Sequence, residues 1–304
     1  MSTNLKKVLI VGGDSLIGAR LRKKLSTQGK VLTLSITRAK CLDTKFTILE
    51  NFELNTNPSA KFNNLIKKYN SIIFLSGITN VNYIESNYHY AKTINVKQTI
   101  KWIKFLTQNG TPVIFPSSSL VYAESYALTE DSPTLPKSAY ANFKLEVEAA
   151  LLGSKINVTI PRFTKILSPN QPLIQKWVES LRKNKNIKAY VDCQISPLDI
   201  DQAVTVLISL ALDSKLKNSR LINISGVQDI SFFNFAKILA QSLKLNPNLV
   251  IPTDSGGELI SKQFFATLQT FKANQLFNFC PQTPEQVVES LKSEIEDSVK
   301  KRNH

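Results

Sequence analysis

Short, continuous apolar runs recur along the first half of the chain and predict buried strands. Such runs are typical of strands that are covered on both faces of a parallel sheet, because neither face leaves room for polar side chains. They lie at 7–11, 31–36, 46–49, 71–75, 113–115 and 157–163.

Between these runs, apolar residues recur three or four positions apart, which predicts helices. The helical segments are 19–28, 62–69 and 90–109. Because strands and helices alternate from Lys7 to Phe163, we predict an α/β fold with a doubly wound parallel sheet.

The pattern changes after Phe163, where the segment 168–172 contains two prolines and reads as a linker. Beyond it, helical spacing predicts helices at 173–181, 198–212, 231–243 and 283–301, and an apolar run predicts a strand at 221–225. Ser231 is expected to cap its helix and Pro284 to occupy the first helical position.

The composition is that of a globular protein with a full core. At 304 residues and 42% hydrophobic content, one large domain with a smaller appendage is expected. The first apolar run is too short for a signal peptide or a membrane span, and no other span is found. Three cysteines, Cys41, Cys193 and Cys280, lack metal-type spacing, so we expect reduced thiols in a cytoplasmic protein with no membrane partner and no metal site.

The net charge of +15 raises the question of a nucleic-acid or membrane-surface partner, and would equally suit an anionic small molecule. The basic residues form short clusters along the whole chain, at 20–24, 67–68, 182–188 and 300–302. This spread favours a solvated surface, so no nucleic-acid partner is expected. The alternative, binding through net charge, predicts salt-sensitive association with any duplex.

A glycine turn follows the first strand. Gly12-Gly13-Asp14-Ser15-Leu16-Ile17-Gly18 joins that strand to the first helix. In this context a phosphate can sit on backbone amides at a helix N-terminus. We therefore predict a dinucleotide site formed by Gly12, Asp14, Ser15, Leu16, Ile17 and Gly18, although the glycines alone would be a weak signal.

The second strand ends at Thr37-Arg38, with no acidic residue to accept hydrogen bonds from the ribose hydroxyls of NAD. The planar, permanently charged guanidinium of Arg38 suits a 2′-phosphate. NADP(H) is therefore favoured over NAD(H), the alternative being an exposed loop arginine.

Two further strand ends carry candidate site residues. The strand 71–75 leads into Ser76-Gly77-Ile78-Thr79, where the glycine allows close approach of a flat ligand. The strand 113–115 delivers Ser117-Ser118-Ser119, whose hydroxyls can donate to a substrate oxygen. The carboxyl ends of parallel strands are the edge at which open α/β sheets bind ligands, but serines are also common turn residues.

Tyr140 and Lys144 are four residues apart in a segment that reads as one helix. This spacing places the phenol and the ammonium on one face, about one turn apart. A nearby ammonium favours the phenolate, which suits a general acid or base. The alternative is an aromatic ring covered by a lysine stem.

Together these motifs resemble the extended short-chain dehydrogenase/reductase family, and most closely its dTDP-4-dehydrorhamnose reductase group of nucleotide-sugar enzymes. The resemblance covers nearly the whole chain. It rests on the segments 77–86, Asn95-Val96, 117–122, Tyr140 with Lys144, Pro161-Arg162-Phe163 and 196–203.

The resemblance implies a Rossmann-type domain at 1–167, to which 191–228 returns, and a smaller C-terminal α/β substrate domain at 168–190 and 229–304. It implies that Ser118 holds the substrate oxygen, that Tyr140 exchanges a proton with it, and that Lys144 lowers the tyrosine pKa and holds nicotinamide-ribose hydroxyls. It adds Ser76, Gly77, Ile78 and Asn95, together with Tyr140 and Lys144 themselves, to the cofactor site, and Thr79, Ser119, Arg162 and Thr164 to the substrate site.

Two positions depart from the family pattern: Ser15 replaces the middle glycine of the turn, and Asn82 stands where the group has aspartate. The first hypothesis is an NADP-dependent reductase of a nucleotide-activated keto-sugar, whose diphosphate would suit Arg182, Lys183, Lys185 and Lys188. The alternatives are a nucleotide-sugar epimerase or dehydratase, and a non-catalytic NADP-binding regulatory protein. A homodimer is compatible with each.

Overall fold

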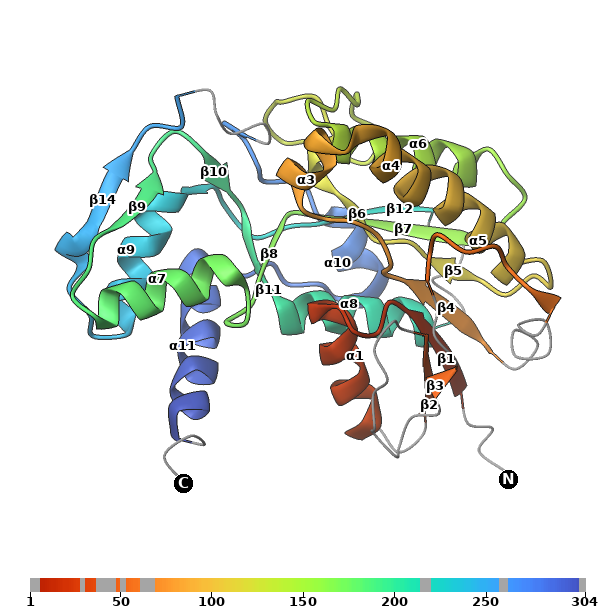
Figure 1. Ribbon diagram of the computed structural model, residues 1–304, viewed down its shortest axis with the longest axis horizontal. Coiled ribbons are helices and arrows are strands. Elements are labelled where there is room, and N and C mark those ends of the chain that lie inside the picture. The colour runs from red at the N-terminus through yellow and green to blue at the C-terminus, as the bar shows by residue number, and fades with distance from the viewer. Residues whose placement is uncertain are drawn as a thin grey trace. The chain divides into compact units, whose positions relative to one another are not determined.

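The computed structural model describes residues 6–27, 31–36, 48–49, 53–60, 69–213, 220–256 and 262–300. The chain divides into two compact units (Figure 1). The first unit comprises Met1–Val121, Pro136–Arg162 and Val204–Ile222, and the second comprises Tyr122–Leu135, Phe163–Ala203 and Asn223–His304.

A mainly parallel sheet forms the centre of the first unit, as the apolar runs predict. Its strand order is β12-β7-β5-β4-β1-β2-β3, with β6 beside β7. The pairs from β3 through β1 to β7 are parallel, which confirms the doubly wound α/β fold. The strands are β1 (Lys6–Val11), β2 (Val31–Ile36), β3 (Ile48–Leu49), β4 (Ser71–Phe74), β5 (Val113–Ile114), β6 (Ser117–Ser118), β7 (Val158–Phe163) and β12 (Leu221–Ile224).

Helices cover both faces of this sheet. In Figure 1, the helices from α3 to α6 lie on one face, and α1 and the part of α8 from Val204 onward lie on the other. Lys24 Nζ of α1 donates to Thr205 Oγ1 of α8 at 2.8 Å. The bounds are α1 (Leu16–Thr27), α3 (Val81–Ser86), α4 (Tyr88–Lys92), the π-helix η2 (Thr93–Gln98), α5 (Thr99–Leu106), the 3-10 turn η3 (Ser119–Val121), α6 (Ala139–Leu152) and α8 (Ile200–Leu212).

The predicted helix at 90–109 differs in detail from the structure. Helical backbone already begins at Val81, is interrupted at Asn87, and passes through one π-helical segment before α5 ends at Leu106. Asn80 starts α3, because its side chain accepts a hydrogen bond from Tyr83 N.

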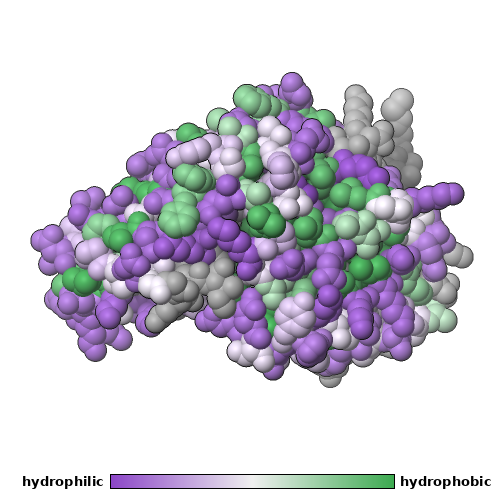
Figure 2. Space-filling view, turned by 90° about the horizontal axis from the view of Figure 1, so that it is seen from above, coloured by the Kyte–Doolittle hydropathy of each residue, from purple (hydrophilic) through white to green (hydrophobic). Residues whose placement is uncertain are grey.

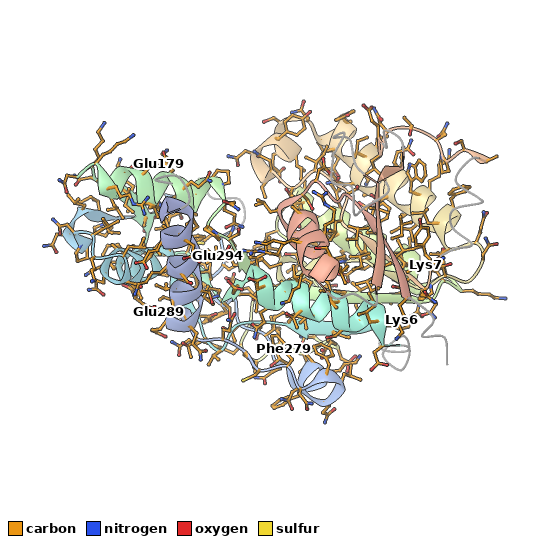
Figure 3. All side chains as sticks on the ribbon, turned by 90° about the horizontal axis from the view of Figure 1, so that it is seen from below. Lys6, Lys7, Glu179, Phe279, Glu289 and Glu294 are labelled. Carbon is orange, nitrogen blue, oxygen red and sulfur yellow. The ribbon has the colours of Figure 1, made fainter. Side chains whose placement is uncertain are left out.

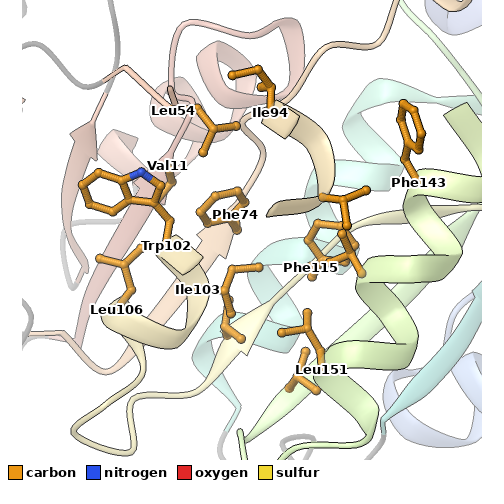
Figure 4. Packing of buried hydrophobic residues seen from close by; sticks show 14 of the residues in the cluster. Val11, Leu54, Phe74, Ile94, Trp102, Ile103, Leu106, Phe115, Phe143 and Leu151 are labelled. Carbon is orange, nitrogen blue, oxygen red and sulfur yellow. The ribbon is translucent and has the colours of Figure 1, made fainter. Parts of the chain in front are cut away.

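One core cluster of the first unit lies between the sheet and the α3–α6 layer (Figure 4). Phe74 and Phe115 project from the sheet side, and Trp102 and Phe143 come from α5 and α6. The indole nitrogen of buried Trp102 donates to Thr56 O at 2.9 Å, so the ring has a polar partner.

The described residues of the second unit form three two-stranded sheets, in which β8 pairs with β11, β9 with β14, and β10 with β13. Its own core is built around Trp177, Phe235 and Leu291. Its strands are β8 (Lys165–Leu167), β9 (Ile187–Tyr190), β10 (Gln194–Ile195), β11 (Pro197–Asp199), β13 (Ile230–Ser231) and β14 (Val250–Thr253), and its helices are α7 (Pro172–Arg182), α9 (Phe232–Ser242), the 3-10 turn η5 (Pro247–Leu249), α10 (Phe271–Phe277) and α11 (Pro284–Lys300).

The caps expected in this unit are present. Ser231 accepts a hydrogen bond from Asn234 N at the start of α9, and α11 begins at Pro284. Glu289, which projects from α11 in Figure 3, accepts a hydrogen bond of 2.8 Å from Ser242 Oγ and so joins α11 to α9.

Some predicted features lie outside the described residues: Phe46 and Thr47 of the third strand, nearly all of the helix at 62–69, and Cys41. Cys193 is buried and Cys280 is exposed, and both are free thiols. In the part of the chain that the structure describes, no helix is long and apolar enough to cross a membrane. Polar residues dominate the face displayed in Figure 2, with apolar residues scattered between them.

Candidate active site

The turn between β1 and α1 requires glycine at two positions. Gly12 has φ +89°, and a Cβ there would lie 2.8 Å from both the N and the Oγ of Ser76. A Cβ on Gly18 would lie 2.4 Å from Gly12 O. The two glycines therefore allow β1, the end of β4 and the start of α1 to approach one another closely.

Ser15, the departure from the family pattern, turns its side chain into this loop. Its Oγ donates to Gly12 O at 2.8 Å and accepts from Gly18 N at 3.0 Å. The hydroxyl thus satisfies one of the amides that α1 leaves without an acceptor in its first turn. Ser15 is a helix cap, and its hydroxyl is bound within the turn.

A cavity of about 530 Å³ opens beside this turn, within the first unit. Its volume lies in the range of small-molecule and cofactor sites. The predicted cofactor residues Gly12, Asp14, Ser15, Ser76, Gly77 and Ile78 line it together. Leu16, Ile17 and Gly18 follow directly at the start of α1.

Among the described residues, seven that line the cavity were not predicted from the sequence: Glu53, Leu54, Asn55, Leu75, Tyr83, Tyr90 and Ile94. Tyr83 and Tyr90 stand seven residues apart, a spacing that places two residues on one helical face, and both are partly exposed aromatics. That spacing was the available signal. Glu53, Leu54 and Asn55 follow the third strand, whose carboxyl end belongs to the ligand edge of the sheet.

Asn95 fixes the backbone of Ile78, which lines the cavity. Its Oδ1 accepts from Ile78 N and its Nδ2 donates to Ile78 O, both at 2.8 Å. Asn95 lies in the π-helix η2, a local conformation that is frequent at functional sites. The structure therefore places Asn95 as a clamp on the loop that lines the cavity.

Tyr140 and Lys144 lie on α6, whose first turn is held from two sides. Ser138 accepts from Ala141 N at 3.2 Å, and the Glu85 carboxylate accepts from Ala139 N at 2.9 Å. The helix packs against β6, which carries Ser118, so the three predicted catalytic residues come from neighbouring elements of the first unit.

Lys144 occupies a well-defined position. Its Nζ donates to Pro116 O at 2.8 Å and lies 4.4 Å from the centroid of the Phe115 ring and 5.9 Å from that of the Tyr140 ring. Burial lowers the pKa of Lys144 to about 8, and the Glu148 carboxylate opposes this shift. Lys144 is therefore still mostly an ammonium at neutral pH.

The pKa of Tyr140 differs from the sequence expectation. The resemblance implies a pKa lowered by Lys144, whereas burial raises the pKa of Tyr140 to about 12 in the protein. The cause is desolvation, because burial disfavours the charged phenolate. Tyr140 is accordingly a protonated phenol throughout the neutral range.

The three serines after β5 have different surroundings. Ser118 Oγ accepts from Leu120 N at 3.2 Å and is partly exposed. Ser117 and Ser119 are both buried, and within the described structure Ser117 Oγ has no hydrogen-bond partner. Of the three, Ser118 is the one placed to meet a substrate.

The predicted substrate residues are not gathered by the structure in the same way. Thr79 is exposed beside the cavity-lining Ile78, whereas the guanidinium of Arg162 is engaged by Glu148. Thr164 belongs to the second unit, where it is buried. The exposed Arg182, Lys183, Lys185 and Lys188 also belong to the second unit, and Arg38 lies outside the described residues.

Comparison with solved structures establishes the fold. UDP-glucuronic acid 4-epimerase from Bacillus cereus, in complex with UDP-glucuronic acid and NAD, is 18% identical with a TM-score of 0.81, over 96% of this chain and 99% of that chain. MoeE5, in complex with UDP-glucuronic acid and NAD, is 19% identical with a TM-score of 0.80, over 96% and 99%. dTDP-glucose 4,6-dehydratase from Bacillus anthracis, in complex with NAD, is 14% identical with a TM-score of 0.79, over 96% and 97%.

No curated protein matches the sequence. The sequence model of one family, described as the RmlD substrate binding domain, matches residues 6–296. This match confirms the predicted resemblance to the dTDP-4-dehydrorhamnose reductase group of the extended short-chain dehydrogenases/reductases. The chain belongs to the RmlD substrate binding domain family.

Proposed function

We propose that the chain is an NADP-dependent oxidoreductase that reduces a keto group on a nucleotide-activated sugar. The observation that carries this proposal is the position of Tyr140 and Lys144 on a helix packed against the Ser118 strand, in the unit that also holds the glycine-turn cavity. Membership of a family does not identify the substrate, so the sugar and its nucleotide are to be identified by assay.

The residues present fit a dinucleotide. Gly12 and Gly18 let the turn pack closely at the start of α1, where a helix N-terminus favours a phosphate, and the Ser15 hydroxyl is bound within its own turn. Gly12, Asp14, Ser15, Ser76, Gly77 and Ile78 would hold the dinucleotide. When bound, the nicotinamide supplies the hydride.

Each catalytic side chain has a task that its surroundings allow. Ser118 accepts from Leu120 N, so its own proton can be donated to the substrate oxygen. Tyr140, with a pKa of about 12, is a proton donor at neutral pH, which suits reduction of a carbonyl. The Lys144 ammonium then stabilises the phenolate that forms.

An epimerase or dehydratase is the second candidate, because the similar structures include a 4-epimerase and a 4,6-dehydratase. Such enzymes regenerate their nicotinamide in every turnover, whereas a reductase consumes NADPH stoichiometrically with substrate. Measuring NADPH consumption by absorbance together with product formation distinguishes the two enzymes.

The test is an assay of the purified chain on UDP- and dTDP-linked 4-keto sugars with NADPH or NADH. Turnover should fall at least about 100-fold in Tyr140→Phe, because the proton donor is lost while the ring is kept. The matched control is Tyr126→Phe, which changes an exposed phenol of the second unit. Full turnover by Tyr140→Phe would refute the assigned mechanism, and dinucleotide binding without turnover would favour the non-catalytic regulatory alternative.

The preference for NADP rests on Arg38. Arg38→Gln should weaken NADPH binding by about 10-fold or more and leave NADH binding nearly unchanged, because only the 2′-phosphate loses its charged partner. Fluorescence titration with both dinucleotides measures this. Equal losses for the two would contradict the proposal. Light scattering would test the homodimer, which stays a prediction.

A further inference from the structure

A buried ion pair lies one helical turn beyond Lys144. Glu148 of α6 and Arg162 of β7 have side chains only 1% and 4% exposed. Arg162 Nε lies 3.2 Å and 3.1 Å from the two Glu148 oxygens, and Arg162 Nη2 lies 2.5 Å from Glu148 Oε2. The mechanism above uses neither residue, although burying two charges is costly.

The ion pair stands in line with the proposed catalytic residues. Tyr140, Lys144 and Glu148 recur every four residues on α6, so they share one face of the helix. Arg162 binds the Glu148 carboxylate from β7, a strand that is buried along its whole length. The ion pair thus holds Glu148 in one orientation, one helical turn from Lys144. In the proposed reaction, Lys144 must carry a positive charge.

We propose that Glu148, held by Arg162, is a positioning residue that keeps Lys144 charged beside Tyr140. This inference rests on the proposed function, since it assigns the pair a role in that reaction. The electrostatics agree: burial pushes the pKa of Lys144 down to about 8, and Glu148 is the carboxylate that pushes it back up. Without that carboxylate, Lys144 would lose its proton closer to neutral pH.

Other charged or titratable groups on the elements packed against α6 have different roles. Glu85 on α3 accepts from the backbone at Ala139. Glu146, two residues before Glu148, forms an ion pair of 2.9 Å with Lys92 at the surface. The described residues of β6 and η3 include none. The other described groups are Tyr83 on α3, Tyr88 on α4, Lys97 on η2, Lys101 and Lys104 on α5, and Arg220, which donates to Leu151 O of α6, and all are exposed.

The experiment measures the titration of Lys144 directly, by NMR of protein labelled with ¹³C at the lysine ε-carbon, with the resonance assigned through Lys144→Arg. The main variant is Glu148→Met with Arg162→Met, which removes both charges and keeps apolar volume, an exchange that buried ion pairs often tolerate. We expect the Lys144 midpoint to fall, by less than loss of the carboxylate alone would cause, because the Arg162 cation is removed with it. In Glu146→Gln, which removes an exposed carboxylate from the same helix, it should not move.

A charge reversal gives an independent check. Glu148→Arg with Arg162→Glu keeps an ion pair but places a cation next to Lys144, so its midpoint should fall further than in the double Met variant. A folded variant of either kind with the wild-type midpoint would overturn the inference. Failure of both to fold would show that the pair serves the fold itself, and would also overturn it.

This titration needs neither substrate nor dinucleotide. It therefore tests the role of Glu148 independently of the proposed function. Absence of turnover with a shifted Lys144 midpoint would count against the proposed function alone. Turnover with an unshifted midpoint would count against the role of Glu148 alone.

Discussion

At the scale of single residues, Lys144 sets an expected pH limit on the reaction. Its pKa of about 8 lies below the ordinary lysine value, because burial disfavours the ammonium. The charged form is therefore complete at acidic pH and is lost as the pH rises through about 8.

We accordingly expect kcat/KM to be level below that pH and to fall about tenfold per pH unit above it. Lys144→Arg should abolish this alkaline limb, because a guanidinium stays charged, even if the absolute rate drops. A pH profile of kcat/KM measures both. An unchanged limb in Lys144→Arg would assign the ionisation to another group.

Ser15 illustrates why a departure from a family motif has to be judged in its surroundings. Ser15 replaces the middle glycine of the family's turn, and its hydroxyl caps α1 and donates back to Gly12 O. Ser15→Ala should lower the free energy of unfolding by about 1 kcal/mol through loss of the cap, and Ser15→Gly by only a few tenths.

Chemical denaturation measures these costs, and a dinucleotide titration completes the test of Ser15. Ser15→Gly should change NADPH affinity by less than about threefold, equivalent to about 0.6 kcal/mol. A gain well beyond that would show that the serine side chain does obstruct the phosphate.

At the scale of elements, the π-helix η2 supports the loop that follows β4. Asn95 is the link, through its two hydrogen bonds to Ile78. Asn95→Ala should cost about 1–3 kcal/mol of unfolding free energy and also weaken dinucleotide binding, because Ile78 lines the cavity.

Thermal denaturation with and without NADPH tests this expectation. Lys97→Ala is the matched control, since Lys97 is exposed on the same π-helix. Loss of stability without any loss of affinity would show that the clamp does not govern the cavity.

At the scale of the whole molecule, the elements that could be predicted are those whose burial is regular. Strands such as β1 and β4 are covered on both faces, so their sequences are continuous apolar runs. The strands β8, β10 and β13 have two or three residues and, unlike the equally short β5, do not lie in a continuous apolar run, so the sequence did not predict them.

The candidate site divides in the same way. Motif positions such as Gly12 and Gly77 were predicted and do line the cavity. Tyr83 and Tyr90 were not predicted, because the predicted helix began only at residue 90, whereas helical backbone already begins at Val81. The raised pKa of Tyr140 was also missed, since burial is a property of the packed core and not of the spacing of two residues.

The net charge of +15 comes from cations that are spread over both units. Exposed lysines occur in both units, for example Lys97 and Lys104 in the first and Lys183 and Lys188 in the second, and they come from separate helices and strands. A nucleic-acid site needs its cations concentrated along the path of a phosphate backbone, because affinity grows with the number of phosphates that are neutralised together. We therefore expect no complex with duplex DNA or RNA at about 10 μM protein and 50 mM salt, measured by fluorescence anisotropy, since even non-specific binders reach dissociation constants of about 10⁻⁴ to 10⁻⁶ M at higher salt. A complex that weakens steeply as salt is added would contradict this expectation and would identify the charge as a functional surface.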